Sequence, residues 1–178
     1  DGKSKYIGLI EPLGFFGAEI AGGSMGLGLP GAVGLALAKK LKGEVGKVYV
    51  LMSDGELAIG TTWESLLIAS HHKLDNLRVF IDYNFLCAMG KTNEILNIEP
   101  LADKWISFGW NVYEINGHSF EELEAQFEED NQNRPTVIIC KTVKGHPISF
   151  MSANNIFHYK QLSPSEYQQA MVELVNEK

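Results

Sequence analysis

Four apolar runs, separated by segments with helical spacing, limit the folds open to this chain more than any other feature. Their β-branched and aromatic residues are typical of buried strands, and the runs lie at residues 47–54, 77–84, 110–116 and 135–143. Apolar residues three or four apart predict helices between these runs, at residues 61–73, 99–109 and 118–130. Strands that alternate with helices favour an α/β fold with a mostly parallel sheet and helices on both faces.

Two further segments carry helix signals. The glycine- and alanine-rich segment 26–43 precedes the first run and is predicted to be helical. The last helix is predicted to begin at SPSE, where Ser163 and Glu166 have the spacing of a capping box. Ser119 and Glu122 show the same spacing and predict a capped start for the helix before the fourth run.

The chain length fits one domain. With 178 residues it can bury a core of its own, and we expect residues 1–178 to form a single domain. The sequence begins at Asp1 rather than at a methionine, so we also expect that an N-terminal part of the natural domain precedes it.

Charge and cysteine content narrow the possible partners. The formal net charge is −7 and the fifteen basic residues form no long cluster, so binding to nucleic acid or an anionic membrane is not expected. No apolar run reaches the 18 residues of a membrane span. Cys87 and Cys140 have no metal-site spacing and suggest no disulfide framework. We therefore expect a cytoplasmic protein whose partners are small molecules or proteins.

Gly26, Gly28 and Gly31 match the pattern G-x-G-x-x-G of dinucleotide-binding loops. That pattern needs a hydrophobic strand directly before the glycines, whereas this chain has the loop-like stretch FFGAEIAGGSM. An NAD-binding oxidoreductase domain is therefore the weaker alternative. The same glycines could also serve a turn and close helix packing without any ligand.

Two polar residues follow the first and second runs. Asp54 ends the first run, and Asn84 ends the second, 30 residues further on. Ligands of parallel α/β sheets bind outside the carboxyl ends of the strands, and Mg²⁺ prefers oxygen ligands. An Asp oxygen, an Asn amide oxygen and a backbone carbonyl just past Asn84 would form part of such a shell. Taken singly, Asp54 could be a helix N-cap and Asn84 a turn residue.

Several stretches together resemble the diphosphate-binding domain of transketolases. In order and spacing they are GGSMGLGLPGAVGLALAKKLKG, VYVLMSDGEL, WESLLIASHHKLDNL, DYNFL, GKT, EPLADKWISFGW and GHSFEEL. The resemblance runs from about Gly22 to His158. It implies a thiamine-diphosphate-binding fold, thiamine diphosphate with Mg²⁺ or Ca²⁺ as cofactors, and transfer of a two-carbon ketol unit between sugar phosphates.

The resemblance also implies roles for individual residues. The metal ligands would be Asp54, Asn84 and the backbone carbonyl of Leu86. The cofactor-binding residues would be Gly23, Ser24, Met25, Asp54, Gly55, Asn84 and His158. His158 would be catalytic, touching both the diphosphate and the reacting substrate. It stands in NNIFHYKQ where the family has Trp-His-Gly, so an ordinary surface role is the alternative.

Three positions depart from the family pattern. Ser53 replaces the first glycine of G-D-G, Ile59 replaces a glutamate that links active sites across a subunit interface, and Met89 replaces an aspartate. An isoleucine cannot carry a proton or accept a hydrogen bond. These changes put ordinary transketolase activity in question, while cofactor binding is expected to remain.

The family's cofactor-activating glutamate lies in a separate pyrimidine-binding domain, and no motif of this sequence matches it. We therefore expect a partner, either a pyrimidine-binding domain or a separate chain, in a homodimer or a heterotetramer that acts on small sugar phosphates. The alternative is a degenerate homologue that binds cofactor or regulates another protein without catalysis.

The other histidines and the tryptophans have structural explanations. His71 and His72 end a predicted helix, where they would cap carbonyls or face solvent, and His118 stands at a helix entrance. The three residues expected on core faces are Trp63, Trp105 and Trp110.

Overall fold

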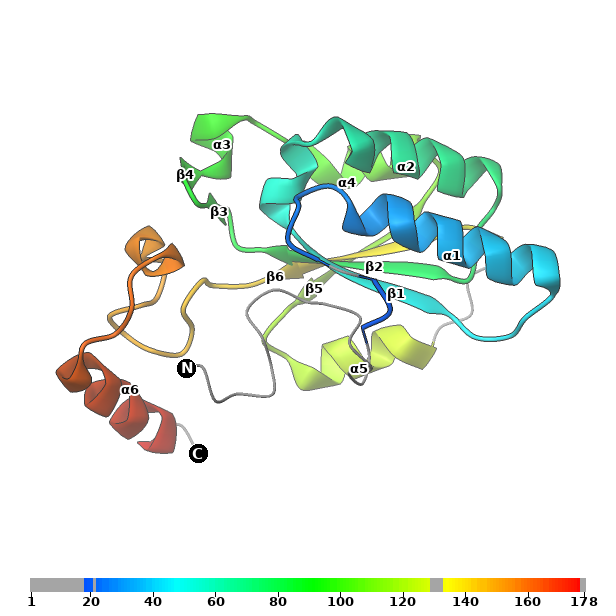
Figure 1. Ribbon diagram of the computed structural model, residues 1–178. Coiled ribbons are helices and arrows are strands. Elements are labelled where there is room, and N and C mark those ends of the chain that lie inside the picture. The colour runs from blue at the N-terminus through cyan, green and yellow to red at the C-terminus, as the bar shows by residue number, and fades with distance from the viewer. Residues whose placement is uncertain (1–17, 21, 129–132, 177–178) are drawn as a thin grey trace.

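The computed structural model describes residues 18–20, 22–128 and 133–176, and its centre is a four-stranded parallel sheet (Figure 1). Across the sheet the strands are β1 (Val48–Ser53), β2 (Leu77–Tyr83), β6 (Thr136–Lys141) and β5 (Asn111–Asn116). Every neighbouring pair is parallel. All four predicted strands are thus confirmed, each somewhat shorter than its apolar run.

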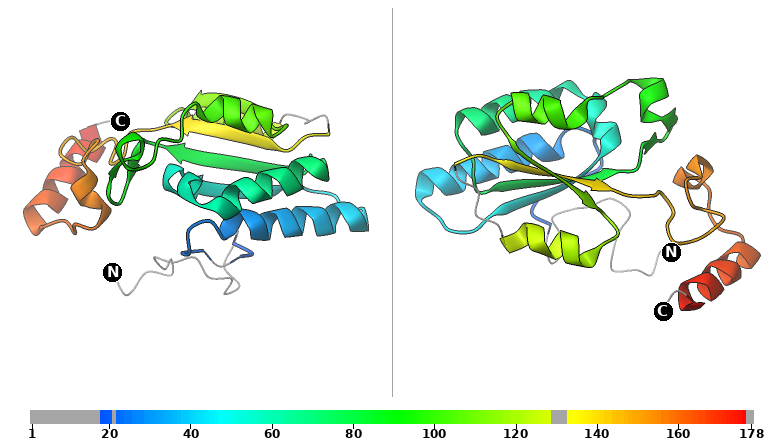
Figure 2. Two further views of the ribbon diagram at one scale, coloured as in Figure 1. Left: turned by 90° about the horizontal axis from the view of Figure 1, so that it is seen from above. Right: turned by 180° about the vertical axis from the view of Figure 1, so that it is seen from behind.

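Helices cover both faces of this sheet, which confirms the predicted α/β class. On one face lie α1 (Gly28–Lys42), α2 (Gly60–His71) and α4 (Leu101–Ser107), and on the other lies α5 (Phe120–Glu128) (Figures 1 and 2). Alternate strand residues point to the two layers. Val79, Ile81, Val137 and Ile139 belong to the larger buried cluster, and Phe80, Ile138 and Ile115 to the smaller one, against which Leu123 of α5 packs.

The tryptophans lie where the sequence places them. Trp105 and Trp110 are buried, and Trp63 is half-buried against the larger cluster. Buried indole N–H groups usually find a partner, and those of Trp63 and Trp110 donate to the backbone carbonyls of Leu57 and Leu66. Nε1 of Trp105 has no hydrogen-bond partner among the described residues. These residues therefore serve packing, as predicted.

The two predicted capping boxes differ. At α6 (Pro164–Asn176) the backbone N–H of Ser163 donates to the Glu166 carboxylate and that of Glu166 to the Ser163 hydroxyl, so the box is complete. At α5 the backbone N–H of Glu122 donates to the Ser119 hydroxyl, but the Glu122 carboxylate accepts from Asn116 N instead. The N–H of Ser119 already donates to the Asn116 carbonyl, so half of that prediction is wrong.

Short elements follow the carboxyl ends of the strands. After β1 comes the 3₁₀-helix η1 (Asp54–Ala58), and after β2 come the hairpin β3 (Leu86–Cys87) and β4 (Gly90–Lys91) and then α3 (Thr92–Ile95). After β6 the chain passes through the 3₁₀-helix η2 (Asn155–His158) to α6, and both lie apart from the sheet layers (Figures 1 and 2). Within the described residues, no helix combines the length and apolar character needed to cross a membrane.

Candidate functional site at the carboxyl edge of the sheet

The register of β1 and β2 brings Asp54 and Asn84 together. Ser53 of β1 lies opposite Asp82 of β2, so the residues that follow both strands share one edge of the sheet. A hydrogen bond joins the two segments, because the backbone N–H of Phe85 donates to Oδ2 of Asp54 at 2.7 Å. The predicted meeting of these strand ends is therefore confirmed.

Asp54 is a buried carboxylate with a free oxygen. Its side chain is 1% exposed, and its Oδ1 atom has no hydrogen-bond partner among the described residues. Burial is the main cause that raises the pKa of Asp54 to about 6; the nearby charge of Asp82 adds to it, and backbone hydrogen bonds from Phe85, Gly55 and Asn84 oppose it. An orphaned buried carboxylate oxygen is costly unless something binds it, so this atom fits a cation ligand.

The alternative role of Asp54 as a helix N-cap is wrong. The residue that caps η1 is Ser53, and Asp54 is the first residue inside the helix. The backbone N–H of Ser53 donates to the Glu56 carboxylate at 3.0 Å, as in a capping box. The Asp54 carboxylate is therefore not needed to cap this helix.

Asn84 is held by hydrogen bonds at both ends of its amide. Its Oδ1 accepts from the backbone N–H of Leu86 at 3.0 Å, and its Nδ2 donates to Oδ2 of Asp82 at 3.0 Å. The turn role is thus present, and it leaves the amide oxygen a second lone pair for a cation. The role of the Leu86 carbonyl as a metal ligand stays a prediction.

The donor set suits a hard cation that accepts amide and backbone oxygens. Residues 18–20, 22–128 and 133–176 contain no cluster of three or more His, Cys, Asp or Glu side chains able to hold a metal. A soft transition-metal centre is therefore not indicated in this part of the chain. One buried carboxylate with neighbouring neutral oxygens is instead typical of Mg²⁺ or Ca²⁺ sites completed by a bound phosphate group.

Hydrogen bonds hold the loop before α1 against the segment after β1. The backbone N–H of Gly26 donates to Oε1 of Glu56 at 3.1 Å, and Oγ1 of Thr61 donates to the Gly26 carbonyl at 2.7 Å. Gly26 has φ +76°, and a Cβ there would lie 2.3 Å from Cγ2 of Ile59. The loop that carries the exposed residues Gly23, Ser24 and Met25 is thereby fixed beside η1.

Gly55 has room for a side chain in the ligand-free fold. A Cβ built on it would meet Cβ of Cys87 at 3.5 Å and Cε of Met25 at 3.7 Å, which are ordinary contacts. The ligand-free fold therefore does not require a glycine at this position. A diphosphate that approaches the backbone N–H would require one. The nearness of Met25 shows that the loop carrying Gly23, Ser24 and Met25, called the glycine loop below, lies beside Gly55.

The dinucleotide-binding alternative loses support. The described residues before Gly26 form no strand, and the N–H of Gly26 donates to Glu56 rather than facing a phosphate. A Cβ at Gly31 would lie 2.9 Å from Cδ1 of Ile20, so this glycine allows close packing. Gly26 and Gly31 thus serve the turn and helix packing proposed as their ligand-free role, whereas a Cβ at Gly28 would meet nothing within 4 Å.

His158 contacts residues that do not belong to the predicted metal or cofactor sites. It is exposed in η2, with Nδ1 3.4 Å from Nζ of Lys144 and its ring 4.7 Å from that of Tyr159. Asn155 links η2 to the turn of the hairpin by donating from Nδ2 to the Ala88 carbonyl. Among the described residues no recorded contact joins His158 to Asp54 or Asn84, so its catalytic role stays a prediction.

The other histidines are structural. His72 is the C-cap residue of α2, and it and His71 are exposed. His118 does more than shape a turn: its Nε2 accepts from the backbone N–H of Val143 at 2.8 Å, and its ring lies 4.1 Å from that of His146. It therefore holds the loop that follows β6.

Glu56, Asp82 and Thr142 also shape the candidate site, although the sequence analysis assigned them no role there. Glu56 binds the glycine loop, and Asp82 accepts hydrogen bonds from Asn84 and from the hydroxyl of Thr142. Ser53 and Glu56 have the capping-box spacing that could have indicated the first. The contact of Asp82 with Thr142 spans 60 residues of sequence and has no local signal.

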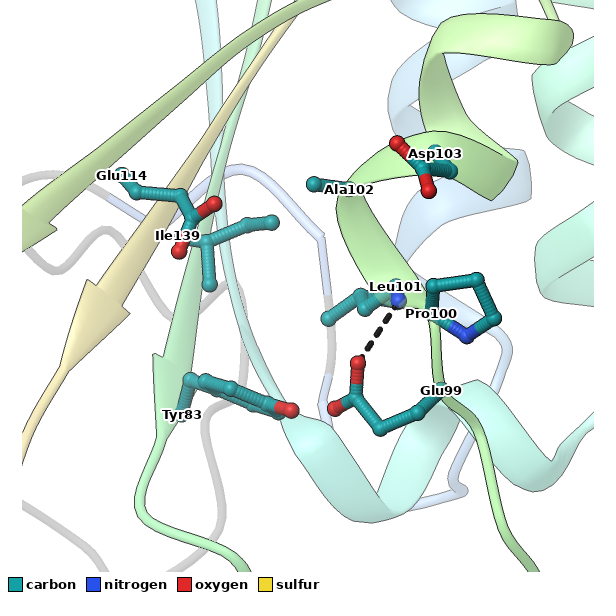
Figure 3. A pocket seen from close by; sticks show the side chains of 8 residues that line it. All are labelled: Tyr83, Glu99, Pro100, Leu101, Ala102, Asp103, Glu114 and Ile139. Atoms are coloured by element: carbon teal, nitrogen blue, oxygen red, sulfur yellow. Dashed lines mark hydrogen bonds between the residues drawn. The ribbon is translucent and has the colours of Figure 1, made fainter.

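A separate cavity of about 270 Å³ lies beside the start of α4 (Figure 3). Its lining residues are Tyr83, Glu99, Pro100, Leu101, Ala102, Asp103, Glu114 and Ile139. Figure 3 shows the Glu99 carboxylate accepting from the backbone N–H of Leu101, at 2.8 Å. None of the predicted cofactor or metal residues lines this cavity, so it is not the predicted site.

The buried carboxyl of Asp54 predicts a pH-dependent stability. In the metal-free chain its pKa of about 6 lies above the ordinary 3.8, so its stabilising contribution is complete below pH 3.8 and lost as the pH rises through about 6. The change should reach about 3 kcal/mol. Urea unfolding with a chelator, from pH 4 to 7, should show it as a difference between wild type and Asp54→Asn. Parallel curves for the two proteins would contradict it.

Comparison with known proteins gives one consistent result. Residues 3–175 match the family model described as "Transketolase, thiamine diphosphate binding domain". The chain is 41% identical over 162 residues to a subunit of the apulose-4-phosphate transketolase of Actinobacillus succinogenes, and 36% identical over 163 residues to a 6-deoxy-6-sulfo-D-fructose transketolase subunit of a Clostridium species. Each match covers 90% of this chain and 59% of the relative, so the chain spans little more than half of their length.

Solved structures agree with the sequence matches. The transketolase of Campylobacter jejuni superposes with a TM-score of 0.81 at 30% identity, over 88% of this chain and 26% of that one. A Pichia stipitis transketolase in complex with sedoheptulose 7-phosphate gives a TM-score of 0.82 at 26% identity, over 88% of this chain and 25% of that one. The chain thus corresponds to about a quarter of these longer proteins.

Proposed function

This chain belongs to the transketolase family, through its thiamine-diphosphate-binding domain, and we propose that it supplies the diphosphate-binding half of an active site that transfers two-carbon ketol units between sugar phosphates. The observation that carries the proposal is the buried, unpartnered Oδ1 of Asp54, whose other oxygen accepts from the N–H of Phe85, the residue after Asn84. A carboxylate in this state gains most from a bound cation.

The residues divide into three roles. Asp54, Asn84 and the backbone carbonyl of Leu86 would hold Mg²⁺ or Ca²⁺. Gly55 would let the diphosphate approach the backbone, and Gly23, Ser24 and Met25 would border the thiamine rings.

When bound, thiamine diphosphate supplies a thiazolium carbon that acts as the nucleophile toward a ketose carbonyl. The part played by the chain is to bind and orient the cofactor at the strand ends and to exclude water around Asp54, which is 1% exposed. His158 would contact the diphosphate and the substrate if η2 approaches the site when a ligand is bound. Its exposed position leaves the imidazole accessible for that contact.

The same proposal requires a partner. The chain spans 59% of relatives that are themselves named as subunits, and no recognised motif supplies the glutamate that activates the cofactor. We infer a pyrimidine-binding chain or domain as partner, in a cytoplasmic homodimer or heterotetramer. The glycine loop and the segment 57–63 would lie at that interface, where Ile59 offers an apolar contact.

The decisive experiment compares the chain, a pyrimidine-binding partner and their mixture. Titration should show that the chain binds thiamine diphosphate with Mg²⁺. NMR of the C2 proton should show accelerated exchange only in the mixture, because proton transfer at C2 needs the partner's acid–base group. Equal acceleration by the single chain would show that the active site is misplaced.

A degenerate homologue remains the second candidate because of one observation. Ile59, which stands where the family has a proton-carrying glutamate, packs against Gly26 in a purely apolar contact. A mixture that binds cofactor and assembles, yet leaves C2 exchange at the rate of free cofactor, would favour this binding or regulatory role.

A further inference from the structure

Asp82 sits at the centre of a hydrogen-bond network behind the candidate metal site. It is half-buried near the end of β2, and its Oδ2 accepts from Nδ2 of Asn84 at 3.0 Å. Its Oδ1 accepts from the hydroxyl of Thr142, and the backbone N–H of Thr142 donates to the Tyr83 carbonyl at 3.2 Å. Both carboxylate oxygens are therefore engaged within the protein.

The network matters because the side-chain amide of Asn84 is not symmetric. Its oxygen can bind a cation, whereas its nitrogen carries two hydrogens and no available lone pair. In the observed orientation the nitrogen donates to Asp82 and the oxygen accepts from Leu86 N. A flipped amide would place its NH₂ group against the Leu86 N–H and its oxygen against the Asp82 carboxylate, and both contacts would be repulsive.

Thr142 connects this hydrogen-bond network to the neighbouring strand β6. It follows β6, whose Cys140 lies opposite Asp82 in the sheet, so the Thr142 hydroxyl reaches Asp82 from the neighbouring strand end. A carboxylate held from one side by a hydroxyl has less freedom to rotate away from the amide on the other. The ends of β2 and β6 thus cooperate in fixing one atom of Asn84.

We propose that Asp82, supported by Thr142, is a positioning residue that makes the oxygen of the Asn84 amide, rather than its nitrogen, available to the metal. This inference rests on the proposed function, because it concerns the same metal site. It assigns Asp82 no contact with metal, cofactor or substrate. Partners of metal ligands commonly change metal affinity by 10- to 100-fold when they are removed.

The test uses four forms of the chain: wild type, Asp82→Asn, Asn84→Asp and the double variant. The affinity for Mg²⁺ in the presence of thiamine diphosphate is measured by calorimetry. Asp82→Asn should weaken it about tenfold, the lower end of the effect of altering a partner of a metal ligand, because a neutral amide holds the Asn84 NH₂ group less firmly than a carboxylate does. In the Asn84→Asp background the same substitution should cost nothing, because a carboxylate offers an oxygen in either orientation and the asparagine introduced at position 82 can donate to it.

These four forms make a double-mutant cycle, which separates an effect of Asp82 on the orientation of the Asn84 amide from an effect of its negative charge. If Asp82 acted only through its negative charge, its replacement by asparagine would weaken Mg²⁺ binding equally in both backgrounds, and that result would overturn the inference. An unchanged affinity in Asp82→Asn would also overturn it while leaving the proposed function in place. A wild-type chain that binds no Mg²⁺ with thiamine diphosphate would refute the proposed function and this inference together.

A second readout needs no metal. In the ligand-free wild type, the side-chain NH₂ of Asn84 should exchange with solvent at least tenfold more slowly than in Asp82→Asn, measured by NMR. Equal rates would contradict the positioning role.

If Asp82→Asn fails to fold, Thr142→Val keeps the charge of Asp82 and removes its second hydrogen bond. It should weaken Mg²⁺ binding about threefold, with no loss in the Asn84→Asp background, and a wild-type affinity would overturn the inference.

Discussion

We expect Asp54→Asn to lower the Mg²⁺-dependent affinity for thiamine diphosphate by at least a hundredfold, about 2.7 kcal/mol. Asp54 is the one carboxylate in the proposed ligand set, and it is 1% exposed with an unpartnered Oδ1. In such a buried place the attraction between the carboxylate and a divalent cation is weakly screened. Asparagine has nearly the same shape and can still accept from the Phe85 N–H, so the fold should be kept. Calorimetric titration measures the effect.

Asp75→Asn is the matched control for this prediction. It removes the same charge, but Asp75 lies just before the start of β2 and pairs with Lys40 at 3.4 Å near the surface. Its loss should change cofactor affinity by less than twofold. An unchanged affinity in Asp54→Asn would refute the proposed site. An equal loss in both variants would mean that the net charge of the chain, rather than a ligand, controls binding.

The second large effect concerns the fold itself: Gly26→Ala should lower the free energy of unfolding by about 3 kcal/mol. Gly26 has φ +76°, where a side chain adds about 1–2 kcal/mol. The new Cβ would also lie 2.3 Å from Cγ2 of Ile59 and 2.9 Å from Oγ1 of Thr61. Overpacking of this kind adds about 1–3 kcal/mol more. Urea unfolding measures the sum.

Gly34→Ala provides the control in the neighbouring helix. Gly34 lies inside α1, where a Cβ would meet nothing within 4 Å, so alanine should raise stability by about 1 kcal/mol. The double variant Gly26→Ala with Ile59→Ala should recover the part of the loss that comes from overlap and keep the part that comes from φ. A Gly26→Ala chain as stable as wild type would mean that the loop is not fixed against η1.

The order of layers in this protein follows from local sequence. The apolar runs, their lengths and the helical spacing between them predicted a mostly parallel sheet with helices on both faces, because burial and periodicity are properties of short segments. The same local logic placed Asp54 and Asn84 at strand ends. Neighbouring parallel strands end at the same edge of a sheet, and β1 and β2 are neighbours, so the residues that follow them lie close together.

Local patterns failed where a neighbouring turn or a tertiary contact decided the outcome. The carboxylate of Glu122 reaches Asn116 rather than Ser119, because the Ser119 N–H was already taken by a turn. The family resemblance grouped His158 with the cofactor residues, and that role stays a prediction, since its contacts in the ligand-free chain are with Lys144 and Tyr159. A loop residue has no periodicity to fix its place, so its position depends on tertiary contacts.

The sequence by itself indicated the α/β class, the edge of the sheet that carries the candidate site and the residue types that meet there. Tertiary structure alone decided how these residues are held: the Glu56 link to Gly26 spans 30 residues and the Thr142 link to Asp82 spans 60. Hydrogen bonds of this kind depend on the distance and angle between two side chains or backbone groups. Those quantities exist only after the sheet has assembled, which is why the chemistry of the site could be anticipated and its supporting network could not.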